Sequence, residues 1–78
     1  MLIPGKLYRP KLTSSFSETE NDAYWYKQDL FLRENDIFML VSWNHLSKDE
    51  ILIKILFNHK LFWRKSAEHN INRWFCRI

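Results

Sequence analysis

Apolar and polar side chains alternate with a period of two residues in several short stretches of the chain, and this pattern predicts β-strands. Residues 6–12 (KLYRPKL) alternate apolar and charged side chains directly after Pro4 and Gly5, which favour a turn. Pro10 restricts this strand to a sheet edge or a strand end, because proline lacks a backbone N–H. Residues 13–22 are polar and rich in turn-forming residues, so we expect a long, mobile loop there.

The segment after this loop leaves two structures open. Ser17 and Glu20 have the spacing of a helix-capping box, which favours a short helix through residues 23–29. The aromatic run at residues 24–26 (YWY) fits an extended conformation at least as well, because aromatic side chains are enriched in strands. Of the two, we expect loop followed by a short strand.

Two stretches carry the strongest strand patterns. In residues 30–43, leucines alternate around Phe31, a polar turn follows at residues 34–36, and a strand begins at Ile37. Both faces of this strand are apolar, as expected for a strand that is covered on two sides. In the second stretch, residues 51–57, one apolar face consists of Ile51, Ile53, Ile55 and Phe57, opposite Leu52, Lys54 and Leu56. We therefore expect the isoleucine face to line the core.

The last third of the chain predicts a hairpin and a final strand. Residues 58–60 connect two strand patterns with hairpin spacing, and Asn58 tolerates the left-handed backbone of such turns. Residues 65–72 predict a loop or one helical turn. Residues 73–78 alternate again, and we expect Trp74, Cys76 and Ile78 to face the core, with Arg73, Phe75 and Arg77 on the outer face.

The order of these elements resembles Src-homology-3-like barrels, which have five short strands, a long loop after the first strand and a short turn before the last. Residues 30–43 are similar to that family's diverging turn, with Asn35 and Asp36 where a Gly-Asp pair is usual. Residues 53–64 (IKILFNHKLFWR) and 73–78 (RWFCRI) are similar to the closing strands of tiny barrels of the type that bacteriophages carry.

The resemblance implies an all-β fold: one small five-stranded barrel over residues 1–78, with room for one short helical turn near the C-terminus. We expect this chain to share the family's scaffold but not its groove for proline-rich peptides. Tyr8 fits the groove's tyrosine, and acidic residues are present in the long loop. However, Ile51 and Leu52 replace the groove's tryptophan pair, and residues 66–71 contain no proline.

Composition agrees with a single domain of 78 residues, in which thirteen aromatic residues supply a core without disulfides. The single cysteine, Cys76, can form no internal disulfide and fits a reducing, cytoplasmic setting. The longest uninterrupted apolar run, residues 37–41, is too short to span a bilayer. We therefore expect a soluble protein without a membrane partner.

The chain offers few groups for catalysis. Gly5 is the only glycine, so a glycine-rich phosphate loop is absent from the sequence. We expect Cys76 to point inward, where thiols are usually inert. The histidine spacing matches no metal motif for His45, His59 and His69. We therefore expect no enzyme, no cofactor and no metal site.

Two binding functions remain, and we favour a protein-interaction module. The chain has more aromatic and apolar side chains than a small barrel can cover. Uncovered aromatic patches mark protein interfaces. The partner would be a second copy of the chain or another protein, such as a host protein if the chain is a phage product. We expect the apolar contact at Tyr24, Trp25, Tyr26 and Trp63, with Arg64 and Lys65 as the polar rim.

The alternative is a basic barrel that binds single-stranded RNA or DNA. Residues 44–78 hold seven Lys/Arg and three Asp/Glu, a net charge of 7 − 3 = +4. An exposed ring beside guanidinium groups would stack on bases while the cations neutralise phosphates. The residues for this reading are Arg64, Lys65, Arg73, Phe75 and Arg77. The simpler interpretation is that Phe75 packs into a small satellite core and that the charges only solvate the surface. Binding that does not change across a salt series would remove the nucleic-acid alternative.

Overall fold

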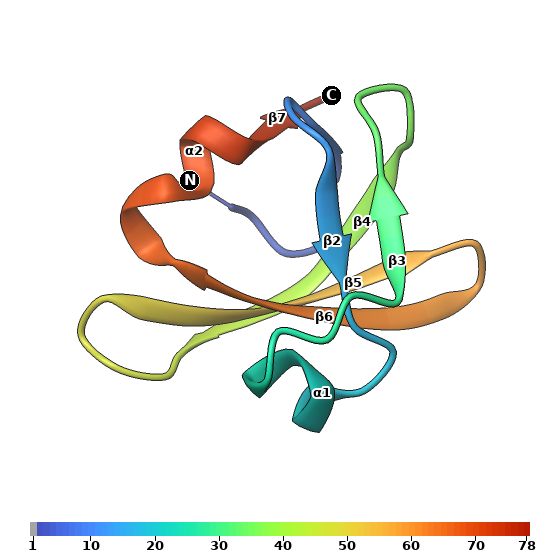
Figure 1. The fold of residues 1–78 in the computed structure, drawn as a ribbon. Helices are drawn as coiled ribbons and strands as arrows, with labels where there is room; N and C mark the ends of the chain where they lie inside the picture. The colour runs from blue at the N-terminus through green and yellow to red at the C-terminus, as the bar shows by residue number, and fades with distance from the viewer. Residues whose placement is uncertain (1) are drawn as a thin grey trace.

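The computed structural model describes residues 2–78, which form a five-stranded and a two-stranded antiparallel sheet around one core (Figure 1). The strand order is β6-β5-β4-β1-β7 in the larger sheet and β2-β3 in the smaller one. The strands are β1 (Leu7–Pro10), β2 (Ser14–Phe16), β3 (Leu30–Leu32), β4 (Phe38–His45), β5 (Glu50–Phe57), β6 (Lys60–Ala67) and β7 (Phe75–Arg77). Three short helices are α1 (Glu20–Tyr24), η1 (Glu68–Asn70) and α2 (Ile71–Trp74). The predicted mainly-β fold is therefore confirmed for the described residues.

The predicted hairpin forms between β5 and β6. Phe57 pairs with Lys60 across a two-residue turn, in which Asn58 and His59 have φ angles of 54° and 67°. Left-handed backbone angles are typical of two-residue hairpin turns, because the twist of such turns matches the twist of the two flanking strands. Asparagine tolerates these angles well. The turn therefore sets the β5–β6 register, and with it the faces on which the strand side chains lie.

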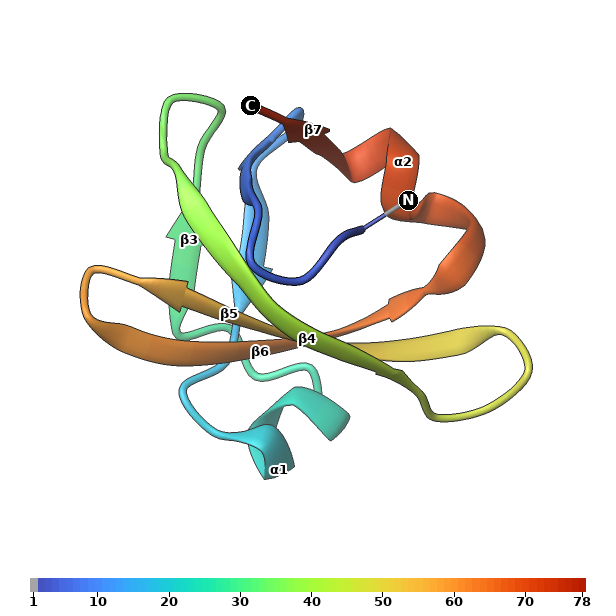
Figure 2. The ribbon, with the colours of Figure 1, turned by 180° about the vertical axis from the view of Figure 1, so that it is seen from behind.

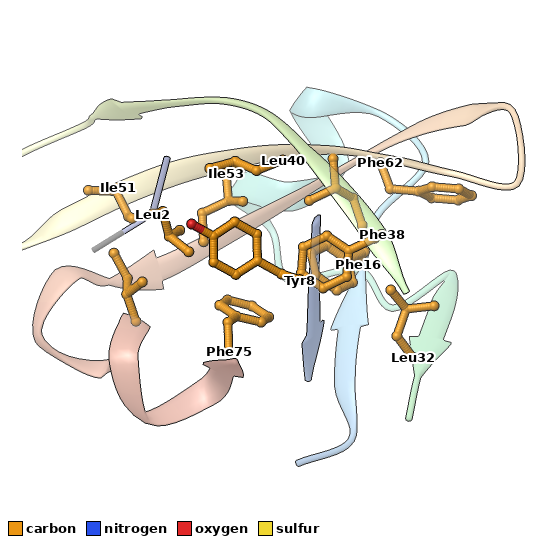
Figure 3. Packing of buried hydrophobic residues seen from close by; sticks show 12 residues of the cluster. Leu2, Tyr8, Phe16, Leu32, Phe38, Leu40, Ile51, Ile53, Phe62 and Phe75 are labelled. Carbon is orange, nitrogen blue, oxygen red and sulfur yellow. The ribbon is translucent and has the colours of Figure 1, made fainter. Parts of the chain in front are cut away.

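The core lies on the inner face of the β4–β5–β6 meander. Ile51, Ile53 and Ile55 are almost fully buried there, as their alternation predicts. In β4 the pairing register shifts between Leu40 and Ser42, so that the strand's inward side changes along its length. Figure 3 shows how Phe38 of β4, Phe62 of β6 and side chains from outside the meander complete the core: Leu2, Tyr8, Phe16, Leu32 and Phe75.

Residues 13–22 do not form the expected loop. They contain strand β2, which pairs with β3, and most of helix α1. Thr19 caps this helix, because its side chain accepts a hydrogen bond from the Asp22 N–H at 3.1 Å. Ser17, which the capping-box spacing pointed to, instead donates its hydroxyl proton to the Lys27 carbonyl. The extended conformation expected for residues 24–26 is also wrong, since Tyr24 ends the helix.

In the final strand, Phe75 and Cys76 do not lie as expected, whereas Arg77 is exposed as expected. Phe75 is 5% exposed and packs in the core, whereas Cys76 is half-buried opposite Arg9. The cause is the pairing with β1, in which Phe75 lies opposite the buried Pro10. The preceding helix α2 sets the phase of this three-residue strand, and a one-residue shift exchanges its two faces. The expectations that the Cys76 thiol points inward and that Phe75 points outward are therefore both wrong.

None of the helices in residues 2–78 is long and apolar enough to cross a membrane.

Replacing Thr19 with alanine should lower the free energy of unfolding by about 1 kcal/mol, because the Asp22 N–H loses its acceptor at the start of α1. In a domain of this size, that loss corresponds to a fall in melting temperature of about 4–8 °C, measurable by circular dichroism. Thr13→Ala is the matched control, since Thr13 is exposed and lies outside the helix. Equal melting temperatures for the two variants would contradict the capping role.

Candidate functional site

Helix α1 lies on the side of the β5–β6 hairpin away from the core, as both views of the ribbon show (Figures 1 and 2). Ala23 of α1 and Leu52 of β5 are both buried, yet neither belongs to the main core cluster. Leu52 alternates with the inward-facing Ile51 and Ile53, so its side chain points to the side on which α1 lies. The helix therefore covers one end of the outer sheet face.

The end of α1 carries three exposed aromatic residues. Trp25 is 79% exposed and Tyr26 is 62% exposed, and Tyr24 beside them is exposed as well. Backbone hydrogen bonds hold this turn in place: Trp25 N–H donates to Asp22 O, and Tyr26 N–H donates to Ala23 O. Tyr26 has a φ of 55°, which reverses the chain direction after the helix. The aromatic side chains thus project from an ordered turn.

Tyr26 joins the outer face of β6 through charged contacts. The Lys65 Nζ lies 5.1 Å from the centre of the Tyr26 ring and 3.3 Å from Glu50 Oε2. The Glu50 carboxylate raises the pKa of Lys65. One row further along the same face, the Lys54 Nζ lies 5.7 Å from the centre of the Trp63 ring. Tyr26, Trp63 and Lys65 therefore share one surface.

A cavity of about 170 Å³ opens at this surface, between β2 and β6. Four of the six residues that the sequence assigns to protein binding line it: Tyr26, Trp63, Arg64 and Lys65. Ser15, Ser17, Ala23, Lys27 and Gln28 complete the lining, and sequence reasoning assigned none of them to a site. Most of these additional residues come from β2 or from the turns around α1. The β2 segment has no detectable alternation of apolar and polar residues. The part of the cavity lining that it supplies could therefore not be predicted from the sequence.

Arg64 does not lie on the exposed rim with Lys65. Adjacent strand residues point to opposite faces, so Arg64 turns away from Trp63 and Lys65. Its Nη1 donates to the Ser15 carbonyl at 2.9 Å, and its guanidinium carbon lies 5.2 Å from the centre of the Trp74 ring. Its Nε is buried without a hydrogen-bond partner, and burial lowers the pKa of Arg64. The expected rim position of Arg64 is thus corrected to a half-buried one.

The structure does not bring the residues of the nucleic-acid reading onto one surface. Phe75 is in the core, so its ring is closed to stacking by bases. Arg64 and Lys65 occupy opposite faces of β6, and Arg73 and Arg77 are exposed near the C-terminus. The expectation of an outer face that combines Phe75 with these cations is wrong.

A row of apolar side chains crosses the uncovered part of the outer sheet face. It follows from the strand register: Leu61 lies opposite Leu56, Leu56 opposite Met39, and Met39 opposite Leu7. The Ile78 N–H donates to the Leu7 carbonyl at 3.1 Å, which extends the row beside β7. Each of these five residues is exposed or half-buried. A contiguous apolar surface of this kind is a second candidate contact region.

These features define a small, mainly-β protein that carries an exposed aromatic surface beside a cavity with basic side chains. Comparisons of the chain with protein-family models, with curated proteins and with solved structures found no match. The function must therefore be argued from the surface itself.

Proposed function

We propose that this chain is a non-enzymatic binding module that recognises another protein through the α1 face, which we define as Tyr24, Trp25, Tyr26, Trp63 and Lys65. The observation that carries the proposal is the 79% exposure of Trp25 on an ordered turn. Tryptophan and tyrosine dominate binding energy at protein interfaces. An aromatic side chain held on an ordered turn also loses little conformational entropy on binding.

The charges around the α1 face favour a protein over a nucleic acid. Lys65 is paired with Glu50, and Lys27 lies 3.7 Å from carboxylate oxygens of both Asp22 and Asp29. A phosphate backbone is bound by cations that release counterions, and nearby carboxylates oppose it. Cations already paired in this way contribute little to such binding. Single-strand binding stays the alternative, and it predicts an affinity that falls steeply with salt.

We further infer that the scaffold is a Src-homology-3-like barrel. The inference is supported by the first strand, β1, which lies between β4 and the last strand, β7. It is supported as well by the β2–β3 hairpin with α1, which occupies the place of the long first loop, and by η1 before the last strand. Ser17 and Trp63 exchange backbone hydrogen bonds of 2.7 and 2.9 Å, which link the two sheets. A cytoplasmic setting fits a single, half-buried cysteine.

A capture experiment tests the function. The tagged chain is incubated with bacterial lysate at low and high salt, with and without nuclease, and bound material is identified by mass spectrometry. We expect one protein in stoichiometric amount that resists both treatments, that Leu12→Ala retains and that Trp25→Ala loses. Leu12 is the matched control because it is exposed and apolar but lies outside the α1 face.

Three outcomes would count against this proposal. Loss of the bound material on nuclease or salt treatment would favour the nucleic-acid alternative. Equal capture by wild type and Trp25→Ala would place the contact elsewhere, with the outer apolar row as the next candidate. Capture of the chain's own untagged copy, with a doubled mass in light scattering, would replace the hetero-partner with a homodimer.

A further inference from the structure

The cavity beside the α1 face forms where two strands separate. Ser17 of the β2 segment pairs with Trp63 of β6, but the pairing does not continue towards Ser15 and Lys65. Instead, the Arg64 side chain reaches the Ser15 carbonyl, and a space of about 170 Å³ remains. We call this space the Arg64 cavity.

Arg64 differs from the two lysines that line the same cavity. Lys27 and Lys65 each form ion pairs with carboxylates of this chain. Among residues 2–78, Arg64 has no acidic partner, and its one hydrogen bond goes to the neutral Ser15 carbonyl. Its Nε is buried without an acceptor. A half-buried cation without a counter-charge is costly, and an anion beside it would offset that cost.

We propose that the Arg64 cavity is a subsite for one carboxylate, supplied by an aspartate or glutamate side chain of the protein bound at the α1 face. This proposal rests on the proposed function. Tyr26 and Trp63 form both part of the α1 face and part of the cavity lining, so one partner segment reaches both. Ser15 and Gln28 line the cavity as well, and their side chains add neutral hydrogen-bond donors.

The charge balance selects a carboxylate over a phosphate. Lys27, Arg64 and Lys65 contribute three positive charges at the cavity, and the carboxylates paired with the two lysines contribute three negative ones: Asp22, Asp29 and Glu50. These charges already sum to zero, so the three carboxylates repel a ligand with one negative charge less than they repel a dianion. Arg64 is the one cation of the three without an ion-pair partner, and it is the group that a single carboxylate would contact. The planar guanidinium also fits the two oxygens of a carboxylate.

Nuclear magnetic resonance of the ¹⁵N-labelled protein tests the subsite without the partner. The reporter is the Arg64 Nε–H resonance, because this N–H is buried and shielded from rapid exchange. At constant pH and ionic strength, the protein is titrated with acetyl-Gly-Glu-Gly-amide, with acetyl-Gly-Gln-Gly-amide and with inorganic phosphate. We expect a saturable shift with the glutamate peptide, none with the glutamine peptide, and a weaker response to phosphate. Equal shifts with both peptides, no saturable shift, or a stronger response to phosphate would overturn the proposal.

Matched arginine variants connect the subsite to the partner. Arg64→Lys keeps the charge but removes the planar donor set, so it should weaken capture of the partner by about tenfold. Arg33→Lys is the control, because Arg33 is exposed on the β3–β4 turn. If circular dichroism shows that Arg64→Lys is unfolded, the wild-type titration alone decides. A negative titration with capture still lost in Trp25→Ala would remove the carboxylate subsite and leave the proposed function standing.

Discussion

Replacing Phe38 with alanine should lower the free energy of unfolding by about 3–5 kcal/mol. Phe38 is 2% exposed, and its ring centre lies 6.2 Å from that of Tyr8, 5.8 Å from Phe16 and 5.5 Å from Phe75. The ring thus joins β4 to β1, β2 and β7, and its removal leaves a cavity that rigid strands close poorly. At roughly 0.05–0.15 kcal/mol per residue, the whole chain has only about 4–12 kcal/mol of stability to lose.

Urea unfolding followed by circular dichroism measures this change. The control is Phe31→Ala, the same substitution at a side chain that is 56% exposed on β3, and it should stay within about 0.5 kcal/mol of wild type. A loss below 1 kcal/mol for Phe38→Ala would mean that the four rings do not form one cooperative core.

The β5–β6 hairpin could be predicted because each signal in it points the same way. Ile51, Ile53 and Ile55 alternate with less apolar residues, and the two-residue turn at Asn58 and His59 sets the register that places them in the core. Where periodicity, turn residues and side-chain size agree, local sequence is sufficient to orient a strand.

Strand β2 could not be predicted, because its burial depends on pairing with β3 and on acceptors for its hydroxyl groups. Ser14 and Ser17 are buried polar residues whose hydroxyls donate to the carbonyls of Leu12 and Lys27. A satisfied hydroxyl can be buried at little cost, but its acceptor is visible only in the fold. The hydroxyl-rich segment therefore has the composition of a loop, and only Phe16 hints at the core.

The positions of the candidate site residues could be predicted only where the strands and helices that carry them could be predicted. The aromatic cluster at the end of α1 is exposed, as the proposed role in binding requires, although it lies on a helical turn and not on the expected strand. Arg64 was misplaced because strand alternation turns it away from the face of Trp63 and Lys65. All three residues still line the same cavity, because the cavity opens at the edge of β6. The outer apolar row depends on register across β6, β5, β4 and β1 and on Ile78 just after β7, and no single segment reveals it.

Helix α1 connects the fold to the proposed function. Its inner residue, Ala23, is buried against the sheet, and its Thr19 cap and Tyr26 turn fix the ends of the segment. A chain that needed α1 only to cover Leu52 would gain nothing from three aromatic side chains facing water. Their exposure is costly for solubility, and a bound surface is the physical reason for it that the structure offers.

Replacing Trp25 with alanine should weaken binding of the captured partner by at least about 30-fold, equivalent to about 2 kcal/mol, and leave the free energy of unfolding within about 0.5 kcal/mol. These two effects separate because the Trp25 side chain is 79% exposed in the free protein and contributes little to its packing. Calorimetric titration of the purified partner measures the first effect, and urea unfolding measures the second.

Tyr26→Phe refines this prediction. The Tyr26 hydroxyl donates to Glu50 Oε2 at 3.5 Å, which is long for a hydrogen bond, so its removal should change neither stability nor binding by more than about 0.5 kcal/mol. Binding would then depend on the ring, which keeps its place 5.1 Å from the Lys65 Nζ. If Tyr26→Phe weakened binding as strongly as Trp25→Ala, the contact would be a polar one centred on Tyr26 and Glu50, and the aromatic α1 face would be the wrong description of it.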